Sequence, residues 1–350
     1  MINFGRTNTD RLALWWRNID KLLFISIIFL MFLGIFFAYT STSNIASERI
    51  YKTDHFLIIK HIFFALISFL ILSSLSLLDA KQIEKYCILG FIITAFLLLL
   101  VLIFGVEVKG SKRWINLIFF RFQPVEVYKP FFVLLCSLII SNSQIGDLKL
   151  RIFYSFCVLF FSLLLLLNQP DVGQSLLIFS VWLILIFVSG ISIALLISLG
   201  LAIFVGISST LLLFNERFSY IFRRLKTFID PSKGDNLQTQ KALESIKQGG
   251  AVIGEEFGIL MILIIFLTMT FIFLRIFTQF SMENNSFRKL VLVGLSCLVY
   301  LQSIINLGVT LNILPNKGMT FPFISYGGSS MIGCAIIFGI LLCFTKRKLS

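Results

Sequence analysis

Long stretches without a charged side chain alternate with short charged segments along this sequence. The stretches without charge are 22–47, 61–78, 86–106, 130–146, 152–170, 172–215, 257–274, 290–316 and 318–345. A helix that crosses a bilayer needs about 20 mostly apolar residues, and a Lys, Arg or Asp at its centre costs about 2.5–3.5 kcal/mol. The stretch 172–215 has room for two such helices, with a tight turn at Ser189-Gly190. The pattern therefore predicts ten transmembrane helices.

The composition supports a membrane protein and argues against a soluble one. Of the 350 residues, 58% are hydrophobic, only 13% are charged and 40 are Phe, whereas about a quarter of the residues are charged in soluble domains. Helices and closed barrels are the structures that satisfy their backbone in lipid, and these runs lack the polar–apolar alternation of barrel strands. We therefore expect an all-α integral membrane protein with irregular loops on its outer face.

Ten spans would place both termini on one side of the membrane. We expect residues 1–20 to form a cytoplasmic segment, 21–345 a single membrane domain and 346–350 a cytoplasmic tail. The positive-inside rule supports this orientation, because both tails and every short loop on that side carry Lys or Arg.

The predicted outer face nevertheless holds about half of the 30 basic residues. They gather in 49–60, 109–129 and 217–247. An anionic substrate would explain this excess, and so would contact with anionic headgroups of the outer leaflet. Because no aqueous domain is large enough to bind a nucleic acid, we do not read the net charge of +13 as a nucleic-acid signal.

The outer loop 105–129 carries residues suited to binding an anion. Arg113 stands beside Trp114, so an indole at headgroup depth could anchor a guanidinium that holds a phosphate or carboxylate. Glu126 and Lys129 are three residues apart and share one face at the start of the next helix. A simple ion pair on the helix surface, with a snorkelling Lys, explains these two residues equally well.

Two further outer segments are irregular at membrane depth. Asp171 lies in a short turn before an apolar helix, so it is a candidate N-cap as well as a candidate functional carboxylate. The segment 313–330 is broken by Pro and Gly, which is tolerated where backbone lines a cavity or is buried in protein. Ser325, Ser329 and Ser330 place hydroxyls there, and a helix that begins near Ser329 would direct its positive end at the cavity.

The predicted loop of about 215–256 is the longest on the outer face. Arg223, Arg224 and Lys226 lie before a Phe and an Asp-Pro turn, which suggests an amphipathic stretch in the membrane interface. Glu255 and Glu256 stand where the next span begins, a position at which negative charge favours a helix. The six Cys all fall inside spans without a metal-ligand spacing, so we expect them to act as small packing residues.

Four of these segments, in this order, resemble the SEDS family (shape, elongation, division and sporulation). The matching stretches are Gly105 to Ile115, Gln123-Pro-x-Glu126-x-x-Lys129, Gln169-Pro-Asp-x-Gly173 and Pro315 to Ser330. The sequence Pro322-Phe-Ile-Ser-Tyr-Gly-Gly-Ser-Ser is the signature of the family, and the similarity runs from about residue 17 to 345. The wording around Lys317 and around Ser41-Thr-Ser43 is closer to the division branch than to the elongation branch.

The resemblance implies a ten-helix membrane fold and a reaction. Members of the family are peptidoglycan glycosyltransferases of the bacterial cytoplasmic membrane that polymerise lipid II outside it. A sugar hydroxyl of one lipid-linked disaccharide attacks the anomeric carbon of the growing chain, and undecaprenyl pyrophosphate leaves. Such chemistry needs a carboxylate base near the hydroxyl and cationic groups on the pyrophosphate. A pyrophosphate leaving group also makes Mg²⁺ or Mn²⁺ plausible.

The resemblance also implies roles for residues and partners. Arg113, Lys129 and Arg224 would contact the pyrophosphate or the glycan. Glu126 would orient Lys129, and Asp171 would line the same cavity with the hydroxyls of Ser325, Ser329 and Ser330. The implied partners are lipid II, a class B penicillin-binding protein that acts as transpeptidase, and other membrane proteins of the divisome. We therefore expect the protein at the division septum.

One departure from the family pattern bears directly on catalysis. In the family, a Gly-Gly like Gly249-Gly250 continues with a Gly-rich loop and a Pro-Glu-x-His-Thr-Asp stretch, whose Asp is regarded as catalytic. Here Gly250 is followed at once by Ala-Val-Ile-Gly-Glu-Glu-Phe-Gly, which in the family comes after that stretch. The sequence contains no His-Thr-Asp, so we infer an internal deletion.

Three accounts of this deletion remain open at the level of sequence. It could be an artefact of the gene sequence, or a real loss that leaves a protein unable to polymerise. In the third account another carboxylate replaces the lost one, and Glu255 is the nearest candidate. A non-catalytic divisome scaffold or a transporter (flippase) of lipid-linked precursors is the alternative function, because neither needs the carboxylate.

Overall fold

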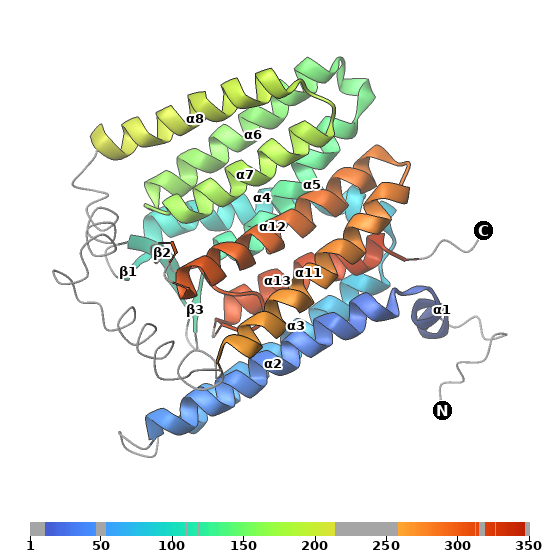
Figure 1. Cartoon of the computed structure of the whole chain (residues 1–350). Coiled ribbons are helices and arrows are strands. Elements are labelled where there is room, and N and C mark those ends of the chain that lie inside the picture. The colour runs from blue at the N-terminus through green and yellow to red at the C-terminus, as the bar shows by residue number, and fades with distance from the viewer. Residues whose placement is uncertain are drawn as a thin grey trace.

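A computed structural model describes residues 11–46, 54–108, 111–117, 120–213, 258–311, 313–314, 319–325 and 327–346, which form a helical bundle (Figure 1). The helices are α1 (Arg11–Asn18), α2 (Lys21–Ala46), α3 (Asp54–Leu77), α4 (Ala80–Phe104), α5 (Pro124–Ser141), α6 (Leu148–Asn168), α7 (Val172–Val188), α8 (Ile193–Leu213), α11 (Gly258–Met282), α12 (Ser286–Thr310) and α13 (Gly328–Phe344), with a 3-10 turn at Ser143–Ile145. Every predicted apolar run coincides with one of these helices or, for 172–215, with two.

Seven of the described helices are long and apolar enough to cross a membrane, namely α2, α3, α4, α5, α6, α11 and α12. The other three predicted spans coincide with shorter apolar helices, Val172–Val188, Ile193–Gly206 and Gly328–Phe344. The all-α membrane fold is thus confirmed, while the count of ten crossings stays a prediction. The predicted loop 215–256, with Arg224 and Glu255, lies outside the described residues.

The predicted turn at Ser189-Gly190 separates α7 from α8. The backbone N–H of Ser189 donates to the carbonyl of Leu185 at 3.1 Å, which closes the last turn of α7. Gly190 follows with φ +96°, a left-handed conformation that glycine adopts without steric cost. The predicted turn is therefore confirmed. It could be predicted from the sequence because it depends on the local conformation of the backbone.

The bundle has a buried centre and an apolar surface. Helix α13 packs against both α3 and α5, and most of its residues are buried. Many large apolar side chains elsewhere are exposed, among them Phe32, Leu70 and Phe96. In a bilayer, lipid covers such side chains, so this exposure is the expected outer surface of a membrane bundle.

The two described ends of the chain meet at one end of the bundle. The indole N–H of Trp15 in α1 donates to Ser76 at 2.9 Å, and Lys346 Nζ donates to the carbonyl of Leu78 at 2.9 Å. Figure 1 shows α1 at the end opposite to the strands described next. This arrangement agrees with an even number of crossings.

A three-stranded antiparallel sheet occupies the segment between α4 and α5, where we expected irregular loops. Its strands are β1 (Val106–Val108), β2 (Ser111–Asn116) and β3 (Arg121–Phe122), in the order β1-β2-β3. Glu107 pairs with Lys112 across the first two strands, and opposite charges in such pairs stabilise a sheet. The expectation of wholly irregular outer loops was therefore wrong for this segment.

Several helices also continue past the apolar runs into basic residues of the short loops that we predicted on the side of the termini. Arg275 lies inside α11, and its Nε contacts Asp20 Oδ2 at 2.8 Å at the start of α2. Lys81 and Lys85 lie in α4, and Lys149 lies in α6. A charge ends an apolar run without ending a helix, because Lys and Arg favour helical backbone.

Candidate functional site

The first two turns of α5 carry a buried ion pair. The helix begins at Pro124, whose fixed φ and missing N–H suit a first helical position. Lys129 Nζ lies 2.8 Å from Glu126 Oε2, and the two side chains are 1% and 4% exposed. The interpretation as a surface ion pair is therefore wrong, because α12 and α13 pack over this face of α5.

Two glutamines from other helices complete the hydrogen bonding of this pair. Gln174 of α7 donates through Nε2 to Glu126 Oε1 at 3.0 Å, and Lys129 donates to Gln302 Oε1 of α12 at 2.8 Å. Both glutamines are buried. A buried ion pair is tolerated when further hydrogen bonds satisfy its remaining atoms. Sequence reasoning missed both residues, although each is a polar residue inside a run without charges.

The network continues from α12 into the segment that precedes α13. Gln302 Nε2 donates to the carbonyl of Thr320 at 2.8 Å, and the hydroxyl of Thr320 lies 2.5 Å from that of Ser330. The hydroxyl of Ser325 accepts from the backbone N–H of Phe321 at 2.8 Å, and Ser329 is buried in the first turn of α13. Ser330 thus joins the network, whereas Ser325 makes a local hydrogen bond within the turn.

A second ion pair joins the sheet to the start of α7. Arg113 Nη1 of β2 lies 3.5 Å from Asp171 Oδ1, and Arg113 also donates to the carbonyl of Pro170. Asp171 caps α7 by accepting from the backbone N–H of Gln174 at 3.4 Å, so the N-cap interpretation is confirmed. Burial raises the pKa of the Asp171 carboxyl above its ordinary value, and the Arg113 guanidinium beside it offsets only part of this rise.

The two ion pairs belong to one arrangement, because Gln174 contacts both of them. Its backbone N–H reaches Asp171, and its side chain reaches Glu126. The structure therefore brings together Arg113, Glu126, Lys129, Asp171 and Ser330, from β2, α5, α7 and α13. We call the linked side chains of Arg113, Asp171, Gln174, Glu126, Lys129, Gln302, Thr320 and Ser330 the buried network.

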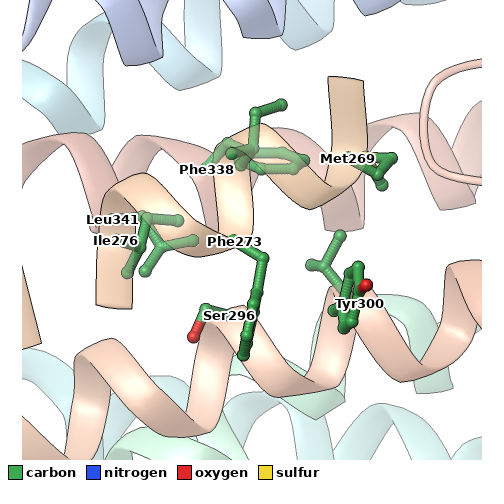
Figure 2. Close-up of a pocket in the computed structure, with 9 residues that line it drawn as sticks. Met269, Phe273, Ile276, Ser296, Tyr300, Phe338 and Leu341 are labelled. Carbon is green, nitrogen blue, oxygen red and sulfur yellow. The ribbon is translucent and has the colours of Figure 1, made fainter. Parts of the chain in front are cut away.

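The described residues offer no group of three or more His, Cys, Asp or Glu that could hold a metal ion. Figure 2 shows a cavity elsewhere, between α11, α12 and α13, of about 10 Å³ and lined mostly by apolar side chains. The hydroxyl of Ser296 at its wall donates to the carbonyl of Val293. A space of this size holds at most one water, so it is a gap in the packing and not a substrate site.

We expect Gly333→Ala to disturb the buried network through the backbone of α5. A Cβ at Gly333 of α13 would lie 2.5 Å from the carbonyl oxygen of Glu126, and overpacking of this kind costs about 1–3 kcal/mol. Thermal unfolding of the purified protein should show the loss. The control is Gly200→Ala in α8, where the nearest atom is 3.9 Å away, and an unfolding temperature as low as that of Gly333→Ala would contradict the explanation.

The sequence and the fold of this chain are similar to those of known proteins. The FtsW/RodA/SpoVE family model, described as cell cycle protein, matches residues 20–250 and 251–349. Its two parts meet between Gly250 and Ala251, where the sequence predicts the deletion. The probable peptidoglycan glycosyltransferase FtsW of Caulobacter vibrioides is 29% identical over 99% of this chain and 94% of its own length. That alignment spans 370 residues, more than this chain contains.

Other proteins extend the comparison. The probable peptidoglycan glycosyltransferase FtsW of Haemophilus influenzae is 30% identical, over 92% of this chain and 89% of its own length. Among solved structures, a chain from a peptidoglycan synthase complex that coordinates polymerization and crosslinking has a TM-score of 0.76 at 24% identity, over 93% and 97% of the two chains. Thermus thermophilus rod shape determining protein RodA has a TM-score of 0.69 at 21% identity, over 94% and 97%. These structures share the fold of this chain.

Proposed function

The chain belongs to the FtsW/RodA/SpoVE family of cell cycle proteins, and from that membership we propose that it is a peptidoglycan glycosyltransferase of cell division that binds lipid II but lacks the Asp with which the family polymerises it. It is a multi-pass bacterial membrane protein, like its relatives. Several curated relatives that match most of its length are named as probable peptidoglycan glycosyltransferases. The division branch predicted from the sequence agrees with these names.

The observation that supports this proposal most directly is the buried network at the end of the bundle opposite the described chain ends. It holds two cationic side chains, Arg113 and Lys129, each paired with a carboxylate. Arg113 is 12% exposed and Lys129 is 1% exposed, so the guanidinium is the cation that a ligand reaches first. A planar guanidinium binds two phosphate oxygens at once, which suits the pyrophosphate of lipid II.

We expect Arg113→Gln to weaken binding of lipid II by about tenfold to a hundredfold, because a charge-assisted hydrogen bond contributes about 1.5–3 kcal/mol. Binding is measured on purified protein in lipid nanodiscs by titration with lipid II. The matched control is Arg121→Gln, since Arg121 is exposed in the same sheet. Equal binding by Arg113→Gln and the unaltered protein, with both folded, would remove Arg113 from the site.

The described part of the site supplies the binding half of the reaction. Glu126 is held by Lys129 and Gln174, and Asp171 by Arg113 and the start of α7. A general base must be within hydrogen-bond reach of the sugar hydroxyl and accept its proton, and both of these carboxylates are already paired with cations. In the family, an Asp in the segment after Gly250 takes the role of the base, and this chain lacks that Asp.

We further propose that the protein works at the division septum together with a class B penicillin-binding protein and other divisome proteins. We also propose that both of its termini lie in the cytoplasm. Support comes from the similar fold of a chain in a peptidoglycan synthase complex. The gap after Gly250 favours either of two other roles, that of a non-catalytic divisome scaffold or that of a transporter of lipid-linked precursors. Movement of fluorescent lipid II across vesicles that hold this chain, without glycan formation, would identify the transporter.

A further inference from the structure

Two amide side chains on one face of α12 hold the segment before α13. Gln302 Nε2 donates to the carbonyl of Thr320 at 2.8 Å, and Asn306 Nδ2 donates to that of Met319 at 2.7 Å. The two residues are four apart and therefore neighbours on the helix surface. Residues 319–325 take their position from these contacts together with the hydrogen bond between Thr320 and Ser330.

Gln302 differs from Asn306 because its other amide atom contacts the ion pair of α5. Its Oε1 accepts from Lys129 Nζ at 2.8 Å. An ammonium group only donates and a carbonyl oxygen only accepts, so the two ends of the amide cannot be exchanged. Gln302 is 2% exposed, so water cannot readily replace either partner. Its orientation is therefore fixed from both sides.

We propose that Gln302 is a positioning residue that couples Lys129 to residues 319–325. While Lys129 is held by Glu126 and Gln302, the amide keeps its hydrogen on the carbonyl of Thr320. An anion that draws Lys129 toward itself leaves Gln302 without its partner and loosens the segment. This consequence rests on the proposed function, in which the anion is a lipid-linked pyrophosphate, but the coupling itself does not.

Hydrogen–deuterium exchange of the full chain in nanodiscs tests the coupling without a ligand. Gln302→Met should speed amide exchange in residues 319–325 by about tenfold, the size expected for one buried hydrogen bond. The variant Glu126→Gln/Lys129→Met removes both charges together, so neither is left buried alone, and should speed the same amides. Adding Gln302→Met to that variant should keep exchange within about threefold of Gln302→Met alone.

A combined variant whose exchange equals the product of the two separate effects would overturn the coupling, since independent structural roles add in free energy. Gln302→Glu has the same shape and serves if Gln302→Met does not fold. It still accepts from Lys129, but its carboxylate faces the carbonyl of Thr320, so exchange should again be fast. The control is Ser303→Ala, because within the described part of the chain the Ser303 hydroxyl donates to the carbonyl of Val299 in its own helix and to no other element.

Undecaprenyl pyrophosphate is the probe for the ligand-dependent effect, the loosening of residues 319–325 by an anion that draws Lys129 away. Its addition should speed exchange in residues 319–325 of the unaltered chain and cause no further change in Gln302→Met. A probe that binds the unaltered chain and leaves this segment unchanged would contradict the coupling. A probe that does not bind at all would contradict the proposed function, and the variants without ligand would still decide the role of Gln302.

Discussion

Replacing Lys129 alone by Met should lower the free energy of unfolding by about 3–5 kcal/mol. The substitution leaves the Glu126 carboxylate 4% exposed and without its cation, although the hydrogen bond from Gln174 remains. A buried charge that has lost its partner keeps its desolvation cost and loses its compensation. The effect is measured by thermal unfolding of the purified protein in detergent, with the fraction of protein that stays monodisperse as the readout.

The comparison that decides this prediction is with Glu126→Gln/Lys129→Met. Removing both charges should cost far less than removing one, because replacing a whole buried ion pair with neutral groups is often close to neutral. Lys149→Met is the control, since Lys149 is exposed on α6 and its charge contributes little. If Lys129→Met were as stable as Lys149→Met, the ion pair would not be buried in the membrane protein.

The purified chain, combined with the class B penicillin-binding protein that we propose as its partner, should form no glycan strands from lipid II. The reason is the missing Asp after Gly250, since a positioned base contributes about a hundredfold to ten-thousandfold to a rate. Inserting the family's Gly-rich and His-Thr-Asp segment between Gly250 and Ala251 should restore polymerisation. The assay separates glycan strands from lipid II by gel electrophoresis.

The matched control is the same insertion with Asn in place of its Asp, which should restore the length of the loop without the activity. Glycan strands made by the unaltered chain would contradict the prediction and direct attention to Glu255, which Glu255→Gln then tests. Resequencing the gene addresses the origin of the gap. Recovery of a His-Thr-Asp segment there would make full enzymatic activity the expected state of the natural protein.

The pattern of apolar and charged residues was enough to predict the long apolar helices that the structure describes, but not the short, partly charged α1. Each run without charges corresponds to a helix, and the turn at Ser189-Gly190 falls where the longest run divides. The reason is that a bilayer requires apolar side chains and satisfied backbone over the whole length of a span. Both requirements act on neighbouring residues, so they can be read along the chain.

The pattern was less informative about the segments between the helices. The small sheet from β1 to β3 was missed, because strands of 3, 6 and 2 residues are too short to show a clear alternation. Arg275 was placed in a loop although it lies in α11 and pairs with Asp20. The charge of Arg275 is tolerated there because a residue 255 positions earlier in the chain supplies the carboxylate.

From the sequence we could infer the membrane fold, the family and most residues of the buried network, including Arg113, Glu126, Lys129 and Asp171. The packing of the helices was needed to show that Glu126 and Lys129 are buried and that Gln174 and Gln302 complete their hydrogen bonding. Gln302 lies 173 positions from Lys129 along the chain. Its role depends on how α12 packs against α5, and a contact between distant helices leaves no trace in the local pattern of either one.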